Sequence, residues 1–260
     1  MICLVGSGNV ATWLLQRLRG CPDFPVAQVY SRQMDHARAA AAIVGAEAVD
    51  DPAQLDPRCR IFIFALRDDA LPQVLSRIPF KMPFAVHTAG SVPQETLAPH
   101  AEHYGVLYPL QTFSKNTDMS ALKVPLCVEC DHAGPHRELL MSLAGALSDT
   151  VRLLNGDQRF YAHLASVFAC NFSNAMCVVA QDILQQHEMS LDLILPLLEQ
   201  TVTKLQTLPP REAQTGPACR GDEAVMGRHL QALTDPRWQE IYRLMSDFIQ
   251  GNTLYNSENQ

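Results

Sequence analysis

The chain has 260 residues, of which 47% are hydrophobic and 18% charged, a balance typical of a folded globular protein and not of a disordered one. Its formal net charge of -7 argues against a broad surface for nucleic acids or acidic membranes. No stretch approaches the roughly 20 consecutive apolar residues of a membrane-spanning helix, and no basic segment precedes the first apolar run. We therefore expect neither a membrane partner nor a secretory signal.

The eight cysteines are scattered along the chain, as expected for reduced thiols in a cytoplasmic protein. Cys127 and Cys130 have CxxC spacing, with His132 and His136 just downstream. A zinc site usually needs a second ligand pair at matching spacing, and none is visible. Residues 124–130 instead have the pattern of a β-strand, in which positions three apart point to opposite faces. We therefore expect no metal site.

Residues 1–155 alternate short apolar runs with helical patterns, which predicts βαβ units and a mostly parallel, Rossmann-type sheet. A first strand at Ile2–Val5 precedes a helix whose apolar stripe contains Leu14 and Leu18. The later expected strands lie at 26–32, 59–66, 83–91, 104–110, 124–130 and 150–155. The later expected helices of this region lie at 35–45, 69–78 and 136–147.

The turn after the first strand nearly matches the GxGxxG fingerprint of dinucleotide-binding proteins, with Ala11 in place of the third glycine. Gly6 permits the tight turn, and Gly8 lets a pyrophosphate approach the helix N-terminus. A plain turn that uses glycine for backbone freedom is the alternative. The order strand, turn, helix favours the nucleotide site. The residues of this turn that we expect to bind the cofactor are Gly6, Ser7, Gly8, Asn9 and Val10.

The end of the second expected strand carries Ser31 and Arg32, where an NAD-binding protein usually has an acidic residue. A hydroxyl beside a guanidinium suits a 2′-phosphate, so we expect NADP as the cofactor. A solvated surface arginine is the alternative interpretation of Arg32.

Ligands of parallel sheets bind beyond the carboxyl ends of the strands, so later strand ends should complete the groove. The predicted cofactor-binding residues there are Leu66, Arg67, Asp68, His87, Thr88 and Ala89. The alternative for His87 is a half-buried histidine whose hydrogen bonds are satisfied within the fold.

Residues 156–260 have no strand pattern, which predicts an all-helical second domain. At about 100° per residue, His163, Cys170 and Asn174 share one face of the long helical segment 157–189, with Asn171 near its edge. The predicted catalytic residues are His163, Asn171, Asn174 and Ser91. A buried hydrogen-bond network, or a polar seam between subunits, is the alternative.

The loop formed by Gln214, Thr215, Gly216 and Pro217 supplies polar groups around a fixed turn and is predicted to close the substrate site. The simpler alternative is a connection between helices, with Asp222 near the start of the next helix.

Several segments together are similar to one family: GSGNVATWL, YSR, HTAGS, YPLQTFS, HLASVFACNFSNAM and QTGPACRGDEAVMGRHLQAL. The chain thereby resembles proteins provisionally assigned as NADP oxidoreductases, with a Rossmann-like domain and a helical C-terminal domain of unassigned function. That family is similar to pyrroline-5-carboxylate reductase and to the β-hydroxyacid dehydrogenases related to 6-phosphogluconate dehydrogenase. The resemblance implies a cleft between domains, a nicotinamide cofactor and a homodimer built through the helical domains.

The expected function is an NADP(H)-dependent oxidoreductase that transfers hydride to or from a small carbonyl, imine or hydroxyacid. His163 is the expected proton donor, because the unperturbed pKa of histidine lies near neutrality. A non-catalytic NADP-binding sensor or scaffold is the alternative, because the long helical segment lacks the lysine that the β-hydroxyacid dehydrogenases use. Pyrroline-5-carboxylate reduction is a narrower third hypothesis.

Overall fold

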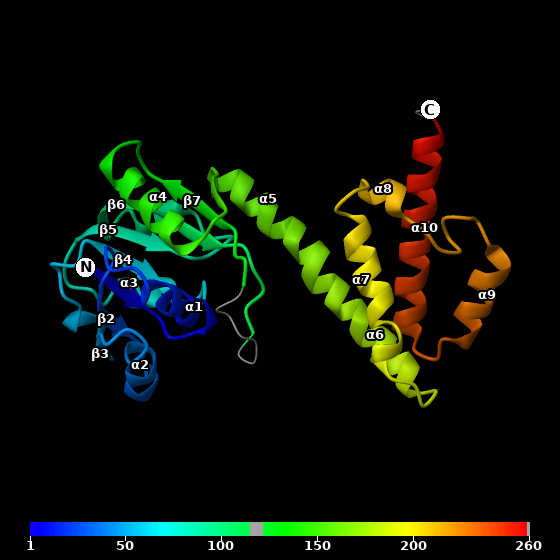
Figure 1. Cartoon of the computed structure of the whole chain (residues 1–260), viewed down its shortest axis with the longest axis horizontal. Coiled ribbons are helices and arrows are strands. Elements are labelled where there is room, and N and C mark those ends of the chain that lie inside the picture. The colour runs from blue at the N-terminus through cyan, green and yellow to red at the C-terminus, as the bar shows by residue number, and fades with distance from the viewer. Residues whose placement is uncertain (115–121, 259–260) are drawn as a thin grey trace. The chain divides into compact units, whose positions relative to one another are not determined.

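The computed structural model describes residues 1–114 and 122–258, the last seven of these by their backbone alone (Figure 1). The chain divides into two compact units, Met1–Cys170 and Asn171–Gln260. The first unit extends past the domain boundary predicted at residue 155, so the start of the long helical segment belongs to the sheet-containing unit. The predicted class, a mostly parallel α/β domain followed by a helical region, is confirmed.

The first unit is built on one eight-stranded sheet in the order β3-β2-β1-β4-β5-β6-β7-β8. Neighbouring strands pair in parallel except β6 and β7, which are antiparallel. The order reverses between β1 and β4, which is the point where doubly wound sheets bind ligands. The strands are β1 Ile2–Val5, β2 Val26–Tyr30, β3 Glu47–Val49, β4 Ile61–Phe64, β5 Met82–His87, β6 Ala101–Pro109, β7 Leu126–Cys130 and β8 Val151–Leu153.

The strands were predicted with one exception, β3, whose three residues are too few to form a visible alternation. The CxxC pair lies in β7, as the strand interpretation of that segment predicts.

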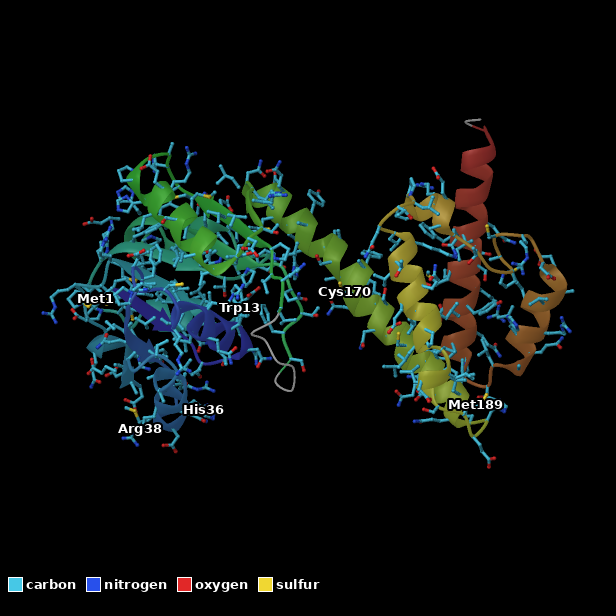
Figure 2. The ribbon with its side chains drawn as sticks, viewed as in Figure 1. Met1, Trp13, His36, Arg38, Cys170 and Met189 are labelled. Atoms are coloured by element: carbon cyan, nitrogen blue, oxygen red, sulfur yellow. The ribbon has the colours of Figure 1, made fainter. Side chains whose placement is uncertain are left out.

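Helices cover both faces of the sheet (Figure 1). They are α1 Asn9–Leu18, α2 Met34–Ala41, α3 Leu71–Leu75 and α4 Pro135–Leu147, with short 3-10 turns η1 Pro52–Gln54 and η2 Gln94–Leu97. The helix after β8, α5 Gly156–Ser166, instead leads away from the sheet (Figure 1). Alternate residues of β1 enter two separate cores: Leu4 packs with Leu14 of α1, and Val5 packs with Leu71 of α3. Trp13 of α1 is fully buried, and its ring centroid lies 5.6 Å from that of Phe113 (Figure 2).

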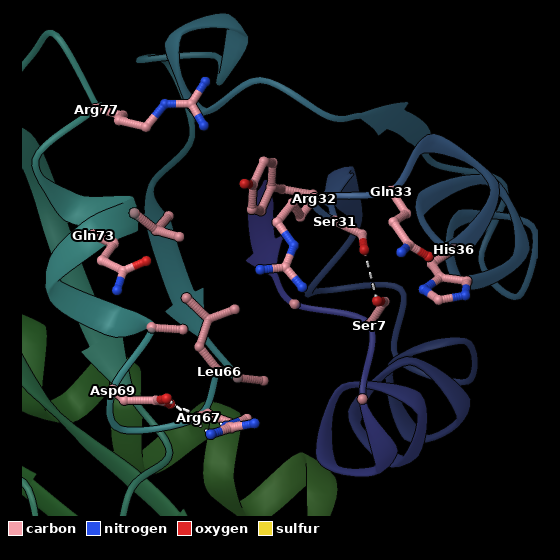
Figure 3. Close-up of a pocket in the computed structure, with 16 residues that line it drawn as sticks. Ser7, Ser31, Arg32, Gln33, His36, Leu66, Arg67, Asp69, Gln73 and Arg77 are labelled. Carbon is pink, nitrogen blue, oxygen red and sulfur yellow. Dashed lines mark hydrogen bonds and ion pairs between the residues drawn. The ribbon is translucent and has the colours of Figure 1, made fainter.

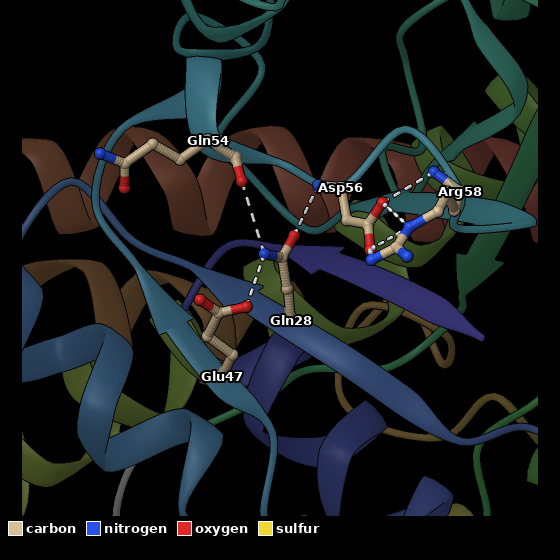
Figure 4. Close-up of polar contacts among 5 residues, drawn as sticks. All are labelled: Gln28, Glu47, Gln54, Asp56 and Arg58. Carbon is tan, nitrogen blue, oxygen red and sulfur yellow. Dashed lines mark hydrogen bonds and ion pairs between the residues drawn. The ribbon is translucent and has the colours of Figure 1, made fainter.

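The buried polar residue Gln28 of β2 joins β2 to β3 and to the segment 54–56 by hydrogen bonds (Figure 4). Its amide nitrogen donates to the Glu47 carboxylate at 2.8 Å and to the Gln54 carbonyl at 3.4 Å. Its amide oxygen accepts from the Asp56 backbone N–H at 2.7 Å. Because its side-chain groups are satisfied within the fold, Gln28 has a structural role.

The second unit is helical. A π-helix, η3 Val167–Phe172, crosses the boundary between the units and leads into α6 Ser173–Gln185. The other elements are η4 Leu191–Leu193, α7 Leu195–Lys204, α8 Pro210–Ala213, α9 Glu223–Ala232 and α10 Pro236–Glu258. The assumption of one regular α-helical periodicity through the long segment is wrong at η3, because a π-turn contains more residues than an α-turn.

Among the described residues, one helical run, Gly156–Gln185, is long and apolar enough to cross a membrane by length and composition alone. None of its most apolar window is buried within the chain. Such a composition equally suits a helix that another protein surface covers.

Candidate functional site

The turn after β1 has the backbone that a dinucleotide site requires. Gly6 has a φ of 134°, and a Cβ at this position would collide with the backbone of Ala65. Its N–H donates to the Tyr30 carbonyl at 2.8 Å, which fixes the turn against β2. Gly8 is the N-cap of α1, and a Cβ built there would meet no atom within 4 Å. The amino end of α1 is therefore open for an anionic group.

A cavity of about 570 Å³ lies beside this turn, at the carboxyl ends of β1, β2 and β4 (Figure 3). Seven predicted cofactor residues line it: Gly6, Ser7, Gly8, Ser31, Arg32, Leu66 and Arg67. The remaining lining residues are Tyr30, Gln33, His36, Ala65, Asp69, Ala70, Gln73, Val74 and Arg77. Tyr30 ends β2 and Ala65 directly follows β4, beside residues that were predicted. Sequence reasoning missed the others, because they lie in helices and loops without a motif of their own.

Three arginines give the cavity its positive charge. Arg32 is exposed and forms no ion pair with any other described residue. Arg77 lies 3.0 Å from Asp51, and Arg67 lies 2.8 Å from Asp69.

The serine beside Arg32 is also held in place, since Ser7 Oγ donates to Ser31 Oγ at 2.8 Å (Figure 3). An uncommitted guanidinium beside two hydroxyls offers donors and no competing carboxylate to a bound phosphate.

Other predicted cofactor residues lie near the cavity without lining it. Asn9 Nδ2 donates to the Phe113 carbonyl at 3.1 Å, and Val10 packs against the core of the sheet. Asp68 accepts a hydrogen bond from Ser91 Oγ at 2.8 Å. Thr88 donates to the carbonyl of Phe64 through its backbone N–H, at 3.1 Å. These contacts hold the loops that surround the cavity.

His87, at the end of β5, is only 1% exposed. Its Nδ1 accepts from the backbone N–H of Ala89 at 3.2 Å. Burial is the main cause that lowers the pKa of His87 to about 4, and the positive charge of Arg159 contributes to this shift. The ring is therefore neutral at physiological pH and holds the loop that follows β5.

That loop is also held by Arg159 of α5, which is 2% exposed and which sequence reasoning missed. One terminal nitrogen of Arg159 donates to the carbonyls of Ala89 and Gly90, at 3.2 and 2.7 Å. Its Nε and its other terminal nitrogen lie 3.1 and 3.0 Å from the Glu129 carboxylate of β7. A single buried guanidinium thus joins α5 to β7 and to the loop after β5.

The same loop contacts a tyrosine–histidine pair. Tyr108 Oη of β6 lies 3.0 Å from Nδ1 of His163 in α5. A Cβ on Gly90 would lie 2.9 Å from both rings, so both side chains pack directly on this glycine. Burial raises the pKa of Tyr108 to about 12, and its hydroxyl stays protonated at neutral pH. Ser91 is the next residue of this loop, and its Oγ donates to the Asp68 carboxylate at 2.8 Å.

A second cavity, of about 540 Å³, lies beside Arg159. Its lining residues are Ser91, Pro93, Glu95, Glu129, Asn155, Gly156, Asp157, Arg159 and Phe160. Ser91 is the predicted catalytic residue among them.

The remaining predicted residues belong to the second unit and stay predictions as site residues. Asn171 and Asn174 are exposed. Gln214 Nε2 donates to the Thr215 carbonyl at 2.9 Å, and Gly216 has a φ of 115° ahead of Pro217.

The residues that follow this loop connect it to the next helix, as the simpler interpretation of the segment predicts. Asp222 caps α9 by accepting from the Val225 N–H at 3.1 Å, as expected for a residue at a helix start.

Residues 124–249 match a family model described as a domain of unknown function, DUF2520. A crystal structure of a Bacteroides fragilis protein, provisionally assigned as an NADP oxidoreductase, is 38% identical, with a TM-score of 0.85. The match covers 96% of this chain and 97% of that one. No protein in the curated comparison matches the chain significantly.

Two more distant structures share the fold. A Thermotoga maritima protein has a TM-score of 0.75 at 18% identity, with all of both chains covered. A pyrroline-5-carboxylate reductase from Coxiella burnetii has a TM-score of 0.59 at 16% identity, covering 98% of this chain and 97% of its own.

Proposed function

Because the chain belongs to the family of the Bacteroides fragilis protein assigned as an NADP oxidoreductase, we propose that it is an NADP(H)-dependent oxidoreductase. The observation that carries this proposal is the cavity at the Gly6–Gly8 turn, which combines an open helix N-terminus with Arg32. The preferred substrates are small carbonyl compounds or imines, with hydroxyacids for the reverse direction.

The residues of this cavity fit a dinucleotide with a 2′-phosphate. The open N-terminus of α1 suits the pyrophosphate, and Gly8 leaves the space that its approach requires. Arg32 and Ser31 would hold the 2′-phosphate, with Arg77 as a second cation on the cavity wall. In the sequence, Ser31 lies between Tyr30 and Arg32, so this strand end lacks the acidic residue that usually binds an unphosphorylated ribose.

The bound nicotinamide would supply or accept hydride, and the protein must then move a proton to or from the substrate. His163 is the group we assign to that proton, because histidine titrates near neutral pH. Tyr108 orients the imidazole through its hydrogen bond to Nδ1, and Nε2 would then be the nitrogen that serves the substrate. Ser91, on the loop after β5, would hydrogen-bond the reacting group. Asn171 and Asn174 remain proposed substrate-orienting residues.

The proposal is tested by NADPH oxidation with the purified chain and a panel of carbonyl, imine and hydroxyacid substrates. Turnover with NADPH and loss of turnover in His163→Ala are the expected results. His187→Ala, an exposed histidine of the second unit, is the matched control and should keep wild-type turnover. Binding of NADH as tight as that of NADPH would contradict the cofactor assignment.

A second candidate is an NADP-binding sensor or scaffold without turnover. It is favoured by one observation, the absence of lysine from Gly156–Gln185. Tight NADPH binding without oxidation on the whole panel, together with recovery of a protein partner, would favour this candidate. A direct assay with proline and its cyclic imine tests the narrower reductase hypothesis.

We further propose a homodimer formed through the helical unit, in the cytoplasm. Large apolar side chains are exposed along its helices, including Leu197 and Val202 of α7 and Leu244 of α10. Burying such side chains against a second copy removes apolar surface from water. A Leu197→Glu, Leu244→Glu double variant should be monomeric by light scattering. A monomeric wild-type chain at micromolar concentration would contradict this proposal.

A further inference from the structure

A cluster of histidine and aspartate side chains lies where β6 starts and β7 ends, at the opposite ends of the strands from the nucleotide cavity. His103 is near the start of β6, where it pairs with Phe84 of β5. Asp131 and His132 follow the end of β7, which runs antiparallel to β6. The cavity at Gly6 instead lies at the carboxyl ends of β1, β2 and β4. The cluster is therefore separate from the site described above.

The cluster is held in place by the fold. The backbone N–H of Asp131 donates to the Tyr104 carbonyl at 3.0 Å, which sets Asp131 beside His103. The ring of His136, at the start of α4, stacks on the ring of His103 with centroids 3.9 Å apart. The Asp131 side chain is only 3% exposed, whereas that of His132 is 77% exposed. One side of the cluster is thus fixed and the other faces solvent.

Three possible metal-ligand atoms converge in this cluster. Nδ1 of His132 lies 3.0 Å from Asp131 Oδ2, and Nδ1 of His103 lies 3.4 Å from the same oxygen. One ligand atom from each residue lies within 4.8 Å of the others. In a tetrahedral zinc site, bonds of about 2.0–2.2 Å place neighbouring ligand atoms roughly 3.3 Å apart. The two nitrogen–oxygen distances agree with that geometry. The third distance joins the nitrogens of His103 and His132, and rotation of the exposed His132 ring can adjust it.

We propose that His103, Asp131 and His132 form a binding site for a divalent transition-metal ion, with zinc as the best-matched ion. Two imidazole nitrogens and one carboxylate oxygen are ligands that zinc prefers, and water on the exposed side would fill the fourth position. The proposal departs from the sequence-based expectation of no metal. His103 is 28 residues before Asp131, so no local spacing motif joins them.

The site would have a structural role, because it lies away from the proposed nucleotide site. A bound ion would link the start of β6 to the turn between β7 and α4, and so stabilise the folded first unit. Ligand binding to the folded state alone raises the free energy of unfolding. Zinc is therefore expected to raise the thermal unfolding midpoint and to leave NADPH affinity unchanged.

The test is a calorimetric titration of zinc chloride into full-length protein freed of metal with a chelator. We expect one zinc per chain, with affinity at least about tenfold weaker in Asp131→Asn and in His132→Ala. His187→Ala is the matched control for a single exposed histidine and should bind zinc as the wild type does. Because His132 is exposed, His132→Ala should fold normally, and circular dichroism of each metal-free variant checks this.

Cobalt binding provides an independent readout of the ligand set. Cys130 Sγ lies 3.4 Å from Asp131 Oδ1, so a thiolate is a competing ligand beside the cluster. The proposed set predicts visible cobalt bands without a thiolate charge-transfer band. A thiolate band, no zinc binding by the wild type, or unchanged affinity in the Asp131 and His132 variants would each overturn the proposal. NADPH binding, measured in parallel, shows separately whether the proposed function fails.

Discussion

The hydroxyl of Tyr108 and Nδ1 of His163 lie 3.0 Å apart, although the residues are 55 positions apart in the chain. Tyr108 lies near the end of β6, a strand that was predicted from its apolar pattern. His163 lies in α5, the first helix after the sheet. Because Gly90 has no side chain, both rings pack on the loop after β5. His163, the proposed proton donor, therefore has its contacts within the first unit, although sequence analysis assigned it to the helical domain.

Tyr108→Phe is expected to lower kcat by about threefold to tenfold, the effect of losing one hydrogen bond worth about 0.5–1.5 kcal/mol. His163→Ala should lower it by about a hundredfold or more, as for loss of a general acid. Tyr108 should not ionise within the pH profile of the wild type near neutrality, because burial raises its pKa to about 12. A Tyr108→Phe profile and rate equal to those of the wild type would contradict the positioning role.

Gly90→Ala should lower turnover while NADPH still binds. Its Cβ would lie 2.9 Å from the rings of Tyr108 and His163, so one or both rings must move. Crowding of this kind costs about 1–3 kcal/mol, which thermal unfolding can measure.

The matched control is Gly145→Ala in α4, where a Cβ meets nothing within 4 Å. Alanine there should stabilise the protein by about 0.5–1 kcal/mol. Equal turnover in the two glycine variants would argue against the Gly90 contact.

Arg32→Ala should weaken NADPH binding by about tenfold to a hundredfold, since hydrogen bonds to charged groups contribute about 1.5–3 kcal/mol. NADH binding should change little, because it lacks the phosphate that Arg32 would hold. Fluorescence titration with both cofactors measures the difference. Arg38→Ala is the control, since this exposed arginine of α2 pairs with Asp35 outside the cavity.

Arg159→Leu should lower the free energy of unfolding by about 3–5 kcal/mol, because it leaves the Glu129 carboxylate without its buried partner. Urea denaturation measures the change, with the exposed Arg152→Leu as control. Adding Glu129→Leu to Arg159→Leu should recover part of the loss, since the uncompensated charge is then removed. A double variant less stable than the single one would refute the ion-pair explanation.

His87 should make stability depend on pH. Its pKa falls from 6.5 to about 4 on folding, so the unfolded chain binds the proton more readily. The stability of the neutral, buried ring is fully present above about pH 6.5 and is lost as the pH falls toward 4. The loss at pH 4.5 is about 2–3 kcal/mol.

The measurement is the free energy of unfolding of wild type and His87→Gln at neutral pH and at pH 4.5. The variant should lose less stability between the two conditions, because glutamine does not titrate. An identical loss in both proteins would show that His87 does not contribute.

The apolar pattern was enough to predict most of the sheet. Ile2–Val5 and the run that contains Ile61–Phe64 are nearly continuous apolar segments, as strands covered on both faces must be. The Gly6–Gly8 turn was recognisable because a turn of this geometry needs glycine at a fixed place in the sequence. β3 was not predictable from its three residues, because its pairing with β2 decides that it is a strand.

Local spacing alone determined the nucleotide half of the candidate site, since Gly6, Gly8, Ser31 and Arg32 follow two adjacent strands directly. Only the tertiary structure brought Arg159 to the loop after β5, Tyr108 to His163, and His103 to Asp131. Each of these contacts joins residues from separate elements, and the register and order of the strands decide which side chains meet. A sequence pattern reports which face of an element is apolar, whereas packing decides which polar groups on different elements come within hydrogen-bond distance.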